Sequence, residues 1–330
     1  SLCDWSSDVC SSDLIKITLY RMTRDSRIAQ ALLAAAQNGK EVVALVELRA
    51  RFNEESNIAW ARRLEDAGAH VVYGVTGYKT HAKAALVVRR TRGEIRRYVH
   101  LGTGNYNETN AAIYEDFSLF TSREEVGEDV TWLFNLLTGY ARPPAFQEIL
   151  VAPMHLRQEL IRRIRREVTH FREGRPAGMI LKLNAIVDPE IIAELYAASE
   201  AGVRTELIVR GICCLRPGVP GLSENIHVVR IVDRFLEHTR CFRFENGGEP
   251  ERWLSSADWM PRNLSGRIEL AFPVHDPRNC REIDSFLHLE LSDDVKASRL
   301  LPDGTSVRVP TDGDGVRSQQ VLMRRARRKT

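Results

Sequence analysis

The sequence predicts two consecutive α/β domains of one design, with mixed sheets and an active site at their interface. Strands and helices alternate along the chain, as they do in sheets with much parallel pairing. A helix, a glycine, a buried strand and an arginine follow one another in both halves, at 28–49 and at 191–210. Each half also places a histidine and, two residues on, a cation at the start of a strand, at 81–83 and at 238–240. An internal duplication of this kind is stronger evidence than either motif alone.

The first predicted domain covers residues 15–150. We expect its strands at 15–20, 41–48, 70–73, 84–88 and 97–101, and its helices at 25–36, 54–67 and 124–137. Asp25-Ser26 offers an N-cap for the first helix, and Asn38-Gly39 closes it. The last helix is amphipathic, and its apolar face consists of Val126, Val130, Leu133 and Leu137. A break at Arg142-Pro143-Pro144 places the domain boundary near residue 150.

The second predicted domain covers residues 151–301 and repeats the pattern. Its strands are expected at 179–187, 205–209 and 226–231, and its main helix at 191–201. A basic helix at 154–171 precedes them. Its arginines form either a solvated face or the rim of a channel for a long polyanion. The Gly/Asp/Pro-rich and then basic stretch at 302–330 predicts a flexible, loosely ordered tail.

Composition limits the classes of function. The net charge is only +3, so an anionic partner requires basic residues that are concentrated locally. The chain has no apolar run of the roughly 18 residues that a transmembrane helix needs. Six cysteines without a CxxC pair favour a reducing compartment, and therefore the cytoplasm.

Residues 1–14 stand apart from the rest of the chain. They lack periodicity and are too polar for the core of a signal peptide. Asp4–Leu14 is similar to a reading frame of a common sequencing adapter. We therefore expect this tail not to be biological sequence, and the native chain to be cut off before Ile15.

The segment 78–83 carries the clearest chemistry. His81 precedes an apolar strand, and Lys79 and Lys83 lie two residues to either side, on the same face of an extended chain. A neutral imidazole is a nucleophile, and two ammonium groups nearby would hold a phosphate against it. The loop Gly102-Thr103-Gly104-Asn105 has a composition that suits anion binding.

These motifs resemble two related families. A His-x-Lys motif in duplicated α/β halves resembles the phospholipase D superfamily, although Val88 stands where that motif ends in aspartate. The resemblance to bacterial polyphosphate kinase of the first type is closer and runs from Ile15 to about Leu301. Its specific stretches include LYRMTRDSRIAQAL, YKTHAK, HLGTGNYNE, LKLNAIVD, LIVRGICCLRPG, RIVDRFLEHTR, FENGG and SSADWMPRN.

The resemblance implies the fold and the reaction. The two halves would be the phospholipase D-like C-terminal domains of the family, and two further domains would precede them, so the chain is expected to be a fragment. The terminal phosphate of ATP would pass to His81 and then to polyphosphate, and the reverse reaction would make ATP from ADP. The full-length protein is expected to be a homo-oligomer in the cytoplasm or peripheral to the inner membrane. No nucleic-acid partner is expected.

The resemblance also assigns residues. His81 matches the phosphorylated histidine, and His238 matches a second active-site histidine that contacts the nucleotide and serves in acid–base catalysis. Tyr114 and Arg210 match nucleotide-binding positions. Arg21 and Arg51 match arginines beside a Mg²⁺ site, where we interpret them as phosphate clamps, because arginine cannot coordinate a cation. Lys83 is added as a phosphate-binding residue from its spacing alone.

Other interpretations stay open. Without its preceding domains, the chain could bind polyphosphate or nucleotide and turn over poorly. A phospholipase D-like phosphodiesterase is a further alternative, and Val88 argues against it. Arg51 could pair with a glutamate of the next helix, and Tyr114 could be an ordinary core residue.

Overall fold

The computed structural model describes residues 13–48, 54–91, 94–139 and 145–329, which form two compact units. The first unit holds the chain up to Ala112 and the segment Ser118–Ile149, and the second holds Ile113–Phe117 and the chain from Leu150 on. The expected first domain, 15–150, therefore differs from the structure at Ile113–Phe117. The reason is a short parallel ladder, in which β7 (Tyr114–Glu115) pairs with β13 (Leu236–Glu237).

The expected adapter-like tail falls on residues 1–12, which lie outside the described residues, and on Asp13 and Leu14. Asp13 is buried, and its carboxylate lies 3.2 Å from Lys40 Nζ. Leu14 begins the first strand, opposite Glu41. These two residues are thus part of the folded sheet.

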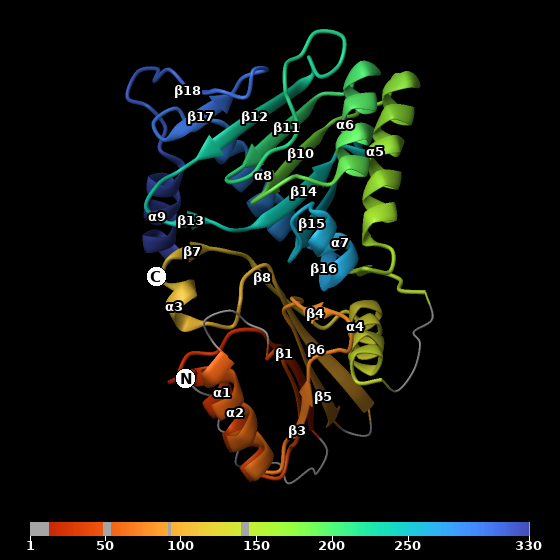
Figure 1. The fold of residues 1–330 in the computed structure, drawn as a ribbon, viewed down its shortest axis with the longest axis vertical. Helices are drawn as coiled ribbons and strands as arrows, with labels where there is room; N and C mark the ends of the chain where they lie inside the picture. The colour runs from red at the N-terminus through yellow and green to blue at the C-terminus, as the bar shows by residue number, and fades with distance from the viewer. Residues whose placement is uncertain (1–12, 49–53, 92–93, 140–144, 330) are drawn as a thin grey trace. The chain divides into compact units, whose positions relative to one another are not determined.

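The first unit is a mixed sheet with helices on both faces (Figure 1). Its strand order is β3-β2-β1-β5-β6-β8, where the three strands β1–β3 are parallel and the others antiparallel. The bounds are β1 (Leu14–Leu19), β2 (Glu41–Val46), β3 (His70–Tyr73), β5 (Ala84–Thr91), β6 (Glu94–Gly102) and β8 (Ser118–Thr121). The predicted strands are confirmed, and β6 begins three residues before its expected start because it forms a hairpin with β5.

The helices of the first unit bury the apolar faces that the sequence predicts. Their bounds are α1 (Arg27–Gln37), α2 (Glu54–Asp66), α3 (Glu108–Ala111) and α4 (Glu124–Leu137). Ser26 caps α1 by accepting from Ala29 N at 3.3 Å. Helices α1 and α2 pack their buried residues against β1 and β2. The predicted apolar face of α4 is buried along its whole length.

The second unit repeats this design with a longer sheet. Its strand order is β18-β17-β12-β11-β10-β14-β15-β16, and β9 pairs with β16. The bounds are β9 (Leu150–Ala152), β10 (Met179–Leu183), β11 (Thr205–Val209), β12 (Ile226–Ile231), β14 (Arg240–Phe244), β15 (Glu251–Ser255), β16 (Arg267–Pro273), β17 (Ala297–Leu300) and β18 (Ser306–Arg308). Only β10, β11 and β12 are parallel to one another among these ladders.

Helices cover both faces of this sheet as well. The bounds are α5 (Leu156–Arg172), α6 (Pro189–Glu200), α7 (Pro261–Gly266), α8 (Pro277–Leu291) and α9 (Ser318–Lys329), with a 3₁₀ turn at Asn246–Gly248. Helices α5 and α6 lie side by side and pack against the face of β10 that carries Leu181 (Figure 1). Helix α8 covers the opposite face, where Lys182 bonds Glu290 at 2.7 Å.

The two sheets share one topology, so the predicted duplication is confirmed. Strands β1, β2, β3, β5, β6 and β8 correspond in order and direction to β10, β11, β12, β14, β15 and β16. Leu19 and Leu183 are equivalent, because each accepts at its carbonyl from the residue that follows the neighbouring parallel strand. Two residues earlier, Ile17 lies opposite Ala85, and Leu181 lies opposite Phe242. Counting back four residues from Ala85 and Phe242 makes His81 equivalent to His238.

Of the two interpretations of α5, the structure disfavours the channel rim, because the arginines at 157, 162, 163, 165 and 166 are paired with carboxylates. Arg157 lies 2.8 Å from Asp188, and Arg166 lies 2.6 Å from Glu251. The remaining pairs are Arg162 and Arg163 with Glu159, and Arg165 with Glu194. These pairs leave little net positive charge along the helix for a polyanion.

The predicted flexible tail is wrong for the segment that forms β18 and α9. Ser318 N and Oγ each donate to Asp293 Oδ2 at 2.7 Å, and Gln319 is buried. The basic run that suggests a loose tail is the exposed end of an anchored helix. No helix in the described part of the chain is both long and apolar enough to cross a bilayer.

Candidate active-site residues

His81 lies in the turn between β4 (Lys79–Thr80) and β5, and only 8% of it is exposed. The buried Lys83 places its Nζ 3.0 Å from each ring nitrogen of His81. Equal distances to both nitrogens put the ammonium over the face of the imidazole, because an in-plane position would collide with Cε1. A cation in this position can neutralise negative charge that develops on a group attached to the ring.

A single hydroxyl holds the backbone around Lys83. Thr18 Oγ1 donates to Ala82 O at 2.8 Å and accepts from Ala84 N at 3.0 Å. Thr18 is buried and belongs to β1, so the central strand of the sheet fixes the turn that carries His81. The geometry between His81 and Lys83 is therefore set by the sheet.

Tyr20, at the end of β1, gathers cations beside this histidine. Its ring meets the His81 ring edge-on, with centroids 4.8 Å apart. Lys79 Nζ lies 5.4 Å from the Tyr20 centroid, and Lys83 Nζ and Arg21 Cζ each lie 5.6 Å from it. Aromatic faces attract cations at such distances. Tyr20 is not among the predicted site residues, although its position between a strand and Arg21 is a usable signal.

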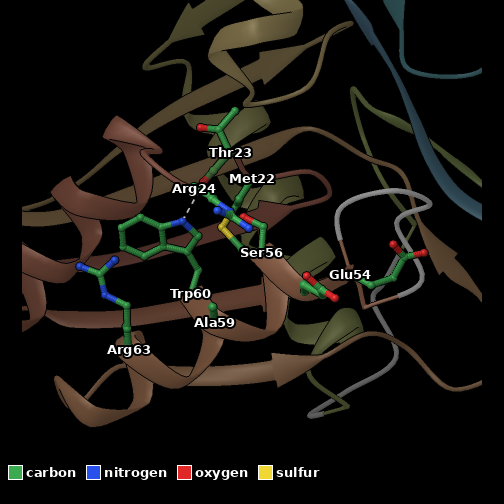
Figure 2. A pocket seen from close by; sticks show the side chains of 9 residues that line it. Met22, Thr23, Arg24, Glu54, Ser56, Ala59, Trp60 and Arg63 are labelled. Carbon is green, nitrogen blue, oxygen red and sulfur yellow. Dashed lines mark hydrogen bonds between the residues drawn. The ribbon is translucent and has the colours of Figure 1, made fainter.

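A pocket of about 710 Å³ is lined in part by the residues that follow Arg21 in sequence (Figure 2). Its walls come from residues 22–24 and from the first turns of α2. Trp60 Nε1 donates to Thr23 O at 2.8 Å, and Arg63 stacks on the Trp60 ring with Cζ 4.0 Å from the centroid. The residues that line it include none of the predicted site residues, so the pocket does not by itself identify the active site.

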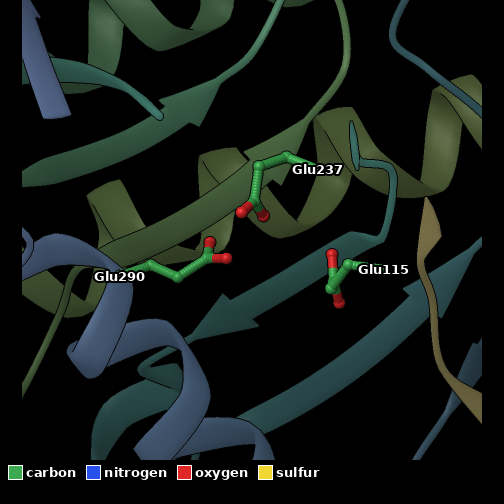
Figure 3. A group of neighbouring side chains, drawn as sticks. All are labelled: Glu115, Glu237 and Glu290. Atoms are coloured by element: carbon green, nitrogen blue, oxygen red, sulfur yellow. The ribbon is translucent and has the colours of Figure 1, made fainter. Parts of the chain in front are cut away.

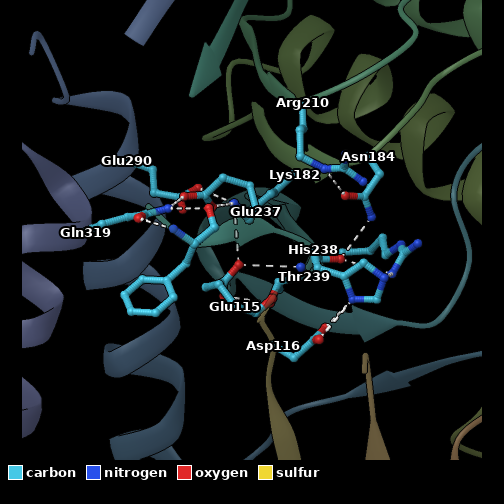
Figure 4. A network of polar contacts seen from close by, with 12 residues as sticks. Glu115, Asp116, Lys182, Asn184, Arg210, Glu237, His238, Thr239, Glu290 and Gln319 are labelled. Atoms are coloured by element: carbon cyan, nitrogen blue, oxygen red, sulfur yellow. Dashed lines mark hydrogen bonds and ion pairs between the residues drawn. The ribbon is translucent and has the colours of Figure 1, made fainter. Parts of the chain in front are cut away.

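His238 occupies the equivalent position in the second unit and has different partners (Figure 4). Its Nδ1 lies 2.8 Å and 2.9 Å from the two carboxylate oxygens of Asp116. Its Nε2 lies 3.2 Å from Arg240 Nη1. A carboxylate accepts and a guanidinium donates, so these partners favour a neutral ring with the proton on Nδ1. The predicted nucleotide-binding residue Tyr114 lies beside it, with ring centroids 4.9 Å apart.

Arg240 is held by a buried carboxylate. Asp258 accepts from Arg240 Nε at 3.2 Å and from Nη2 at 2.9 Å. Burial opposes the charge on Asp258, but Arg240 and two backbone N–H donors outweigh burial and hold the pKa of this carboxyl at about 2. The carboxylate therefore stays charged and keeps the guanidinium beside His238.

Arg210 reaches the same histidine through one amide. Arg210 Nε donates to Asn184 Oδ1 at 2.8 Å, and Asn184 Nδ2 donates to His238 O at 2.9 Å. Burial, and then the neighbouring charge of Arg240, lower the pKa of Arg210. In the described part of the chain, the Arg210 side chain has no hydrogen-bond partner besides Asn184. Arg210 is a predicted site residue, whereas Asn184 and Asp116 are not, because only the fold brings these two residues to the histidine.

One carboxylate cluster in the described residues has a geometry that could surround a cation (Figure 3). It consists of Glu115, Glu237 and Glu290. The Lys182 ammonium already lies among them, 2.5 Å from Glu237 and 2.7 Å from Glu290. Burial opposes the charge on Lys182, but the carboxylates outweigh burial and raise the pKa of its ammonium. The cluster is an ion-pair cage around an ammonium, not a metal site.

The expected Mg²⁺ site beside Arg21 and Arg51 has only one described member. Arg51 lies outside the described residues. Arg21 Nε is buried and has no hydrogen-bond partner among the described residues. A buried donor of this kind is suited to binding an anion such as a phosphate. The expected shared cleft of His81 and His238 stays a prediction.

The loops after β6 and β15 are equivalent and differ in charge. Gly102-Thr103-Gly104-Asn105 occupies the place of Ser255-Ser256-Ala257-Asp258, so Asn105 stands where Asp258 binds its arginine. Asn105 Oδ1 is buried without a hydrogen-bond partner among the described residues. The position that is a carboxylate in the second unit is thus a neutral amide in the first unit.

Two family models match the chain. Residues 6–143 match polyphosphate kinase C-terminal domain 1, and residues 149–320 match polyphosphate kinase C-terminal domain 2. The second match extends beyond Leu301, where the expected resemblance ends, and includes the start of α9.

Curated relatives agree with these models. A polyphosphate kinase of Thermosynechococcus vestitus is 54% identical over 313 residues, which are 94% of this chain and 43% of that protein. A polyphosphate kinase of Streptomyces coelicolor is 51% identical over 317 residues, which are 96% of this chain and 42% of that protein. The chain therefore spans less than half the length of the curated relatives it matches.

Solved structures support the same similarity. The crystal structure of polyphosphate kinase from Porphyromonas gingivalis has a TM-score of 0.89 and 43% identity, and covers 96% of this chain and 48% of that chain. Phosphatidylserine synthase of Haemophilus influenzae has a TM-score of 0.60 at 11% identity, over 97% of this chain and 89% of that chain, which shows a shared fold only. The expected architecture of two α/β domains with mixed sheets is confirmed, and the phospholipase D-like assignment of these domains stays a prediction.

Proposed function

This chain belongs to the polyphosphate kinase family, whose C-terminal domains 1 and 2 it carries, and we propose that it performs the phosphoryl-transfer chemistry of such an enzyme through His81. The substrates would be ATP or ADP and inorganic polyphosphate. The observation that supports this role best is the buried Lys83 ammonium 3.0 Å from both nitrogens of His81. A phosphoryl group on the ring would carry negative charge directly beside a fixed cation.

The reaction would be two displacements. A His81 nitrogen attacks the γ-phosphorus of ATP, a P–N bond forms while the bond to the β–γ bridging oxygen breaks, and ADP leaves with the electron pair. A terminal oxygen of polyphosphate then attacks the same phosphorus, and the P–N bond breaks. Phosphoryl transfer depends mainly on positioning and charge neutralisation, and splitting it at a histidine is covalent catalysis.

The other predicted residues would hold the substrates. Arg21 and Arg51 would clamp phosphates, and Tyr114, Arg210 and His238 would contact the nucleotide. Mg²⁺ fits this arrangement as an ion held largely by phosphate oxygens, since Mg²⁺ at such sites takes few protein ligands. Bound there, it would neutralise phosphate charge. A cytoplasmic location and a homo-oligomeric full-length protein also remain predictions.

The test is transfer of label from γ-³²P-ATP in the presence of Mg²⁺. We expect an acid-labile, base-stable label on the chain that the His81→Ala variant loses. His227→Ala is the control, because His227 is an exposed histidine on β12. A His81→Ala variant that is labelled like the wild type contradicts the assignment.

Two alternatives have their own outcomes in this experiment. Binding of polyphosphate or ADP without any label supports a chain that binds its substrates but does not turn over. This alternative is considered because the chain spans less than half the length of its relatives. Hydrolysis of a phosphodiester without ATP-dependent labelling supports a phosphodiesterase.

A further inference from the structure

We propose that Gln319, at the start of α9, is a positioning residue for His238. Helix α9 would then be part of the nucleotide-binding machinery, although the sequence predicts a loose tail there. The inference rests on the proposed function, in which His238 contacts the nucleotide.

Gln319 binds the segment that leads into His238. Its Oε1 accepts from Phe235 N at 2.8 Å, and its Nε2 donates to Phe235 O at 2.9 Å. The same Nε2 donates to Glu237 Oε1 at 2.6 Å. The amide thus pairs with the backbone as a neighbouring strand would, and it is 4% exposed. One side chain fixes both the backbone and a carboxylate within four residues of His238.

The residues on both sides of His238 belong to the same buried network (Figure 4). Before it, Glu237 binds Lys182 at 2.5 Å. After it, Thr239 Oγ1 donates to Glu115 Oε1 at 2.7 Å. Glu115 lies 3.7 Å from the Lys182 ammonium. The cage around Lys182 therefore holds the backbone of His238 from both directions, and Gln319 is the contribution of α9 to it.

The amide character of Gln319 matters in this cage. Glu115, Glu237 and Glu290 already place three carboxylates around one ammonium. An amide supplies a donor to Glu237 without adding charge, whereas a fourth carboxylate would repel it. This requirement is specific to the side chain and does not follow from helix packing alone.

Helix α9 has other anchors that survive the loss of Gln319. Ser318 donates to Asp293 at 2.7 Å, and Arg317 binds Asp233 at 2.5 Å and 2.8 Å. A Gln319 variant should therefore keep α9 in place while it releases Phe235 and Glu237. This separates positioning from folding.

The experiment compares Gln319→Leu with Gln320→Leu in the whole chain. Gln320 is the next residue of the same helix and is exposed, so it is a matched control. We expect Gln319→Leu to shift the NMR resonances of the His238 ring and to weaken ADP binding by about 10-fold, as the loss of buried hydrogen bonds predicts. Gln320→Leu should change neither, and the melting temperatures of both variants should show that α9 stays folded.

A third variant, Gln319→Glu, tests the donor directly. When protonated at acidic pH, its carboxyl group can donate one hydrogen bond to Glu237 but cannot also donate to Phe235 O, so ADP affinity should recover in part as the pH falls. Gln319→Leu should show no such recovery.

Two results separate this inference from the proposed function. If Gln319→Leu leaves the His238 resonances unchanged and ADP affinity within twofold of wild type, the inference is refuted. If the wild-type chain does not bind ADP at all, the proposed nucleotide role of His238 fails. The His238 resonances then still decide whether Gln319 positions the ring.

Discussion

Asp116→Asn is the sharpest test of how His238 is prepared for its role. Asp116 can only accept, and it holds Nδ1 of the ring at 2.8 Å and 2.9 Å, so it selects the tautomer with the proton on Nδ1. An asparagine can instead turn its NH₂ group toward Nδ1. The ring proton would then move to Nε2, which faces the donor Nη1 of Arg240 at 3.2 Å. Two donors would oppose each other.

The magnitude follows from the kind of hydrogen bond that is lost. A hydrogen bond to a charged group in a mostly buried site contributes about 2 kcal/mol. The Asp116 side chain is 20% exposed and that of His238 10%, so this value needs only a modest reduction for solvent. We therefore expect nucleotide affinity to fall by about 10- to 30-fold in Asp116→Asn, since 1.4 kcal/mol corresponds to a factor of ten.

The assay measures the tautomer and the affinity separately. Ring ¹⁵N shifts of His238 report which nitrogen carries the proton, and titration with ADP gives the affinity. Asp303→Asn is the control, because Asp303 is an exposed turn aspartate in the same unit. A variant in which Nδ1 keeps the proton and affinity is unchanged would refute the assignment of Asp116 as the group that orients the ring.

Two further predictions concern charge. Asn105→Asp would give the first unit a carboxylate at the position equivalent to Asp258. We expect labelling of His81 to slow by about 10- to 100-fold, because the added charge would neutralise the positive field of the nearby cations. The control Asn279→Asp, at an exposed asparagine, should leave the labelling rate unchanged. Burial raises the pKa of Glu115 from 4.5 to about 7, so the folded state binds more protons than the unfolded state between these values. Stability should fall by about 3 kcal/mol as the pH rises through this window. Burial also raises the pKa of the neighbouring Glu290, so Glu115→Gln should reduce that slope in urea unfolding curves, and an unchanged slope would contradict the shift.

Periodicity and turn signals predict most of the fold because they act locally. Ser26 caps α1 as expected, and the predicted apolar face of α4 is the buried face. The misassigned segment Ile113–Phe117 is too short to carry a periodic pattern. Its place in the second unit depends on a ladder of two residue pairs with β13, which no local signal encodes.

The site is predictable where neighbours in sequence carry it. The His-x-cation spacing predicts a cation beside each histidine. The structure shows Lys83 next to the ring of His81 and Arg240 next to the ring of His238. The groups that tune these histidines come from far along the chain. Asp116 lies 122 residues from His238 in sequence, and only tertiary structure brings them within 2.8 Å.

The charged stretch at 302–330 is predicted to be flexible, and this prediction is wrong for β18 and α9. A run of arginines at 324–328 is typical of a solvated extension, and that pattern outweighs the two polar residues before it. Those residues, Ser318 and Gln319, are buried and bond Asp293 and Glu237. Polar residues that are buried through specific partners look like surface residues in a sequence, so the anchoring of α9 could not be predicted.

Under the proposed function, the duplication would explain why His81 and not His238 is phosphorylated. Both halves keep a histidine with a cation over or beside its ring, but the second half surrounds His238 with carboxylates. Asp116 holds the ring, and Asp258 neutralises Arg240. A phosphoryl group on Nδ1 of His238 would meet the negative charge of Asp116, and the charge of Arg240 beside Nε2 is already balanced by Asp258. In the first unit, the residue equivalent to Asp258 is Asn105, which carries no charge, and Tyr20 gathers further cations beside His81. Divergence at these few positions therefore gives one ring an environment that favours a phosphoryl group and the other an environment that fixes a tautomer.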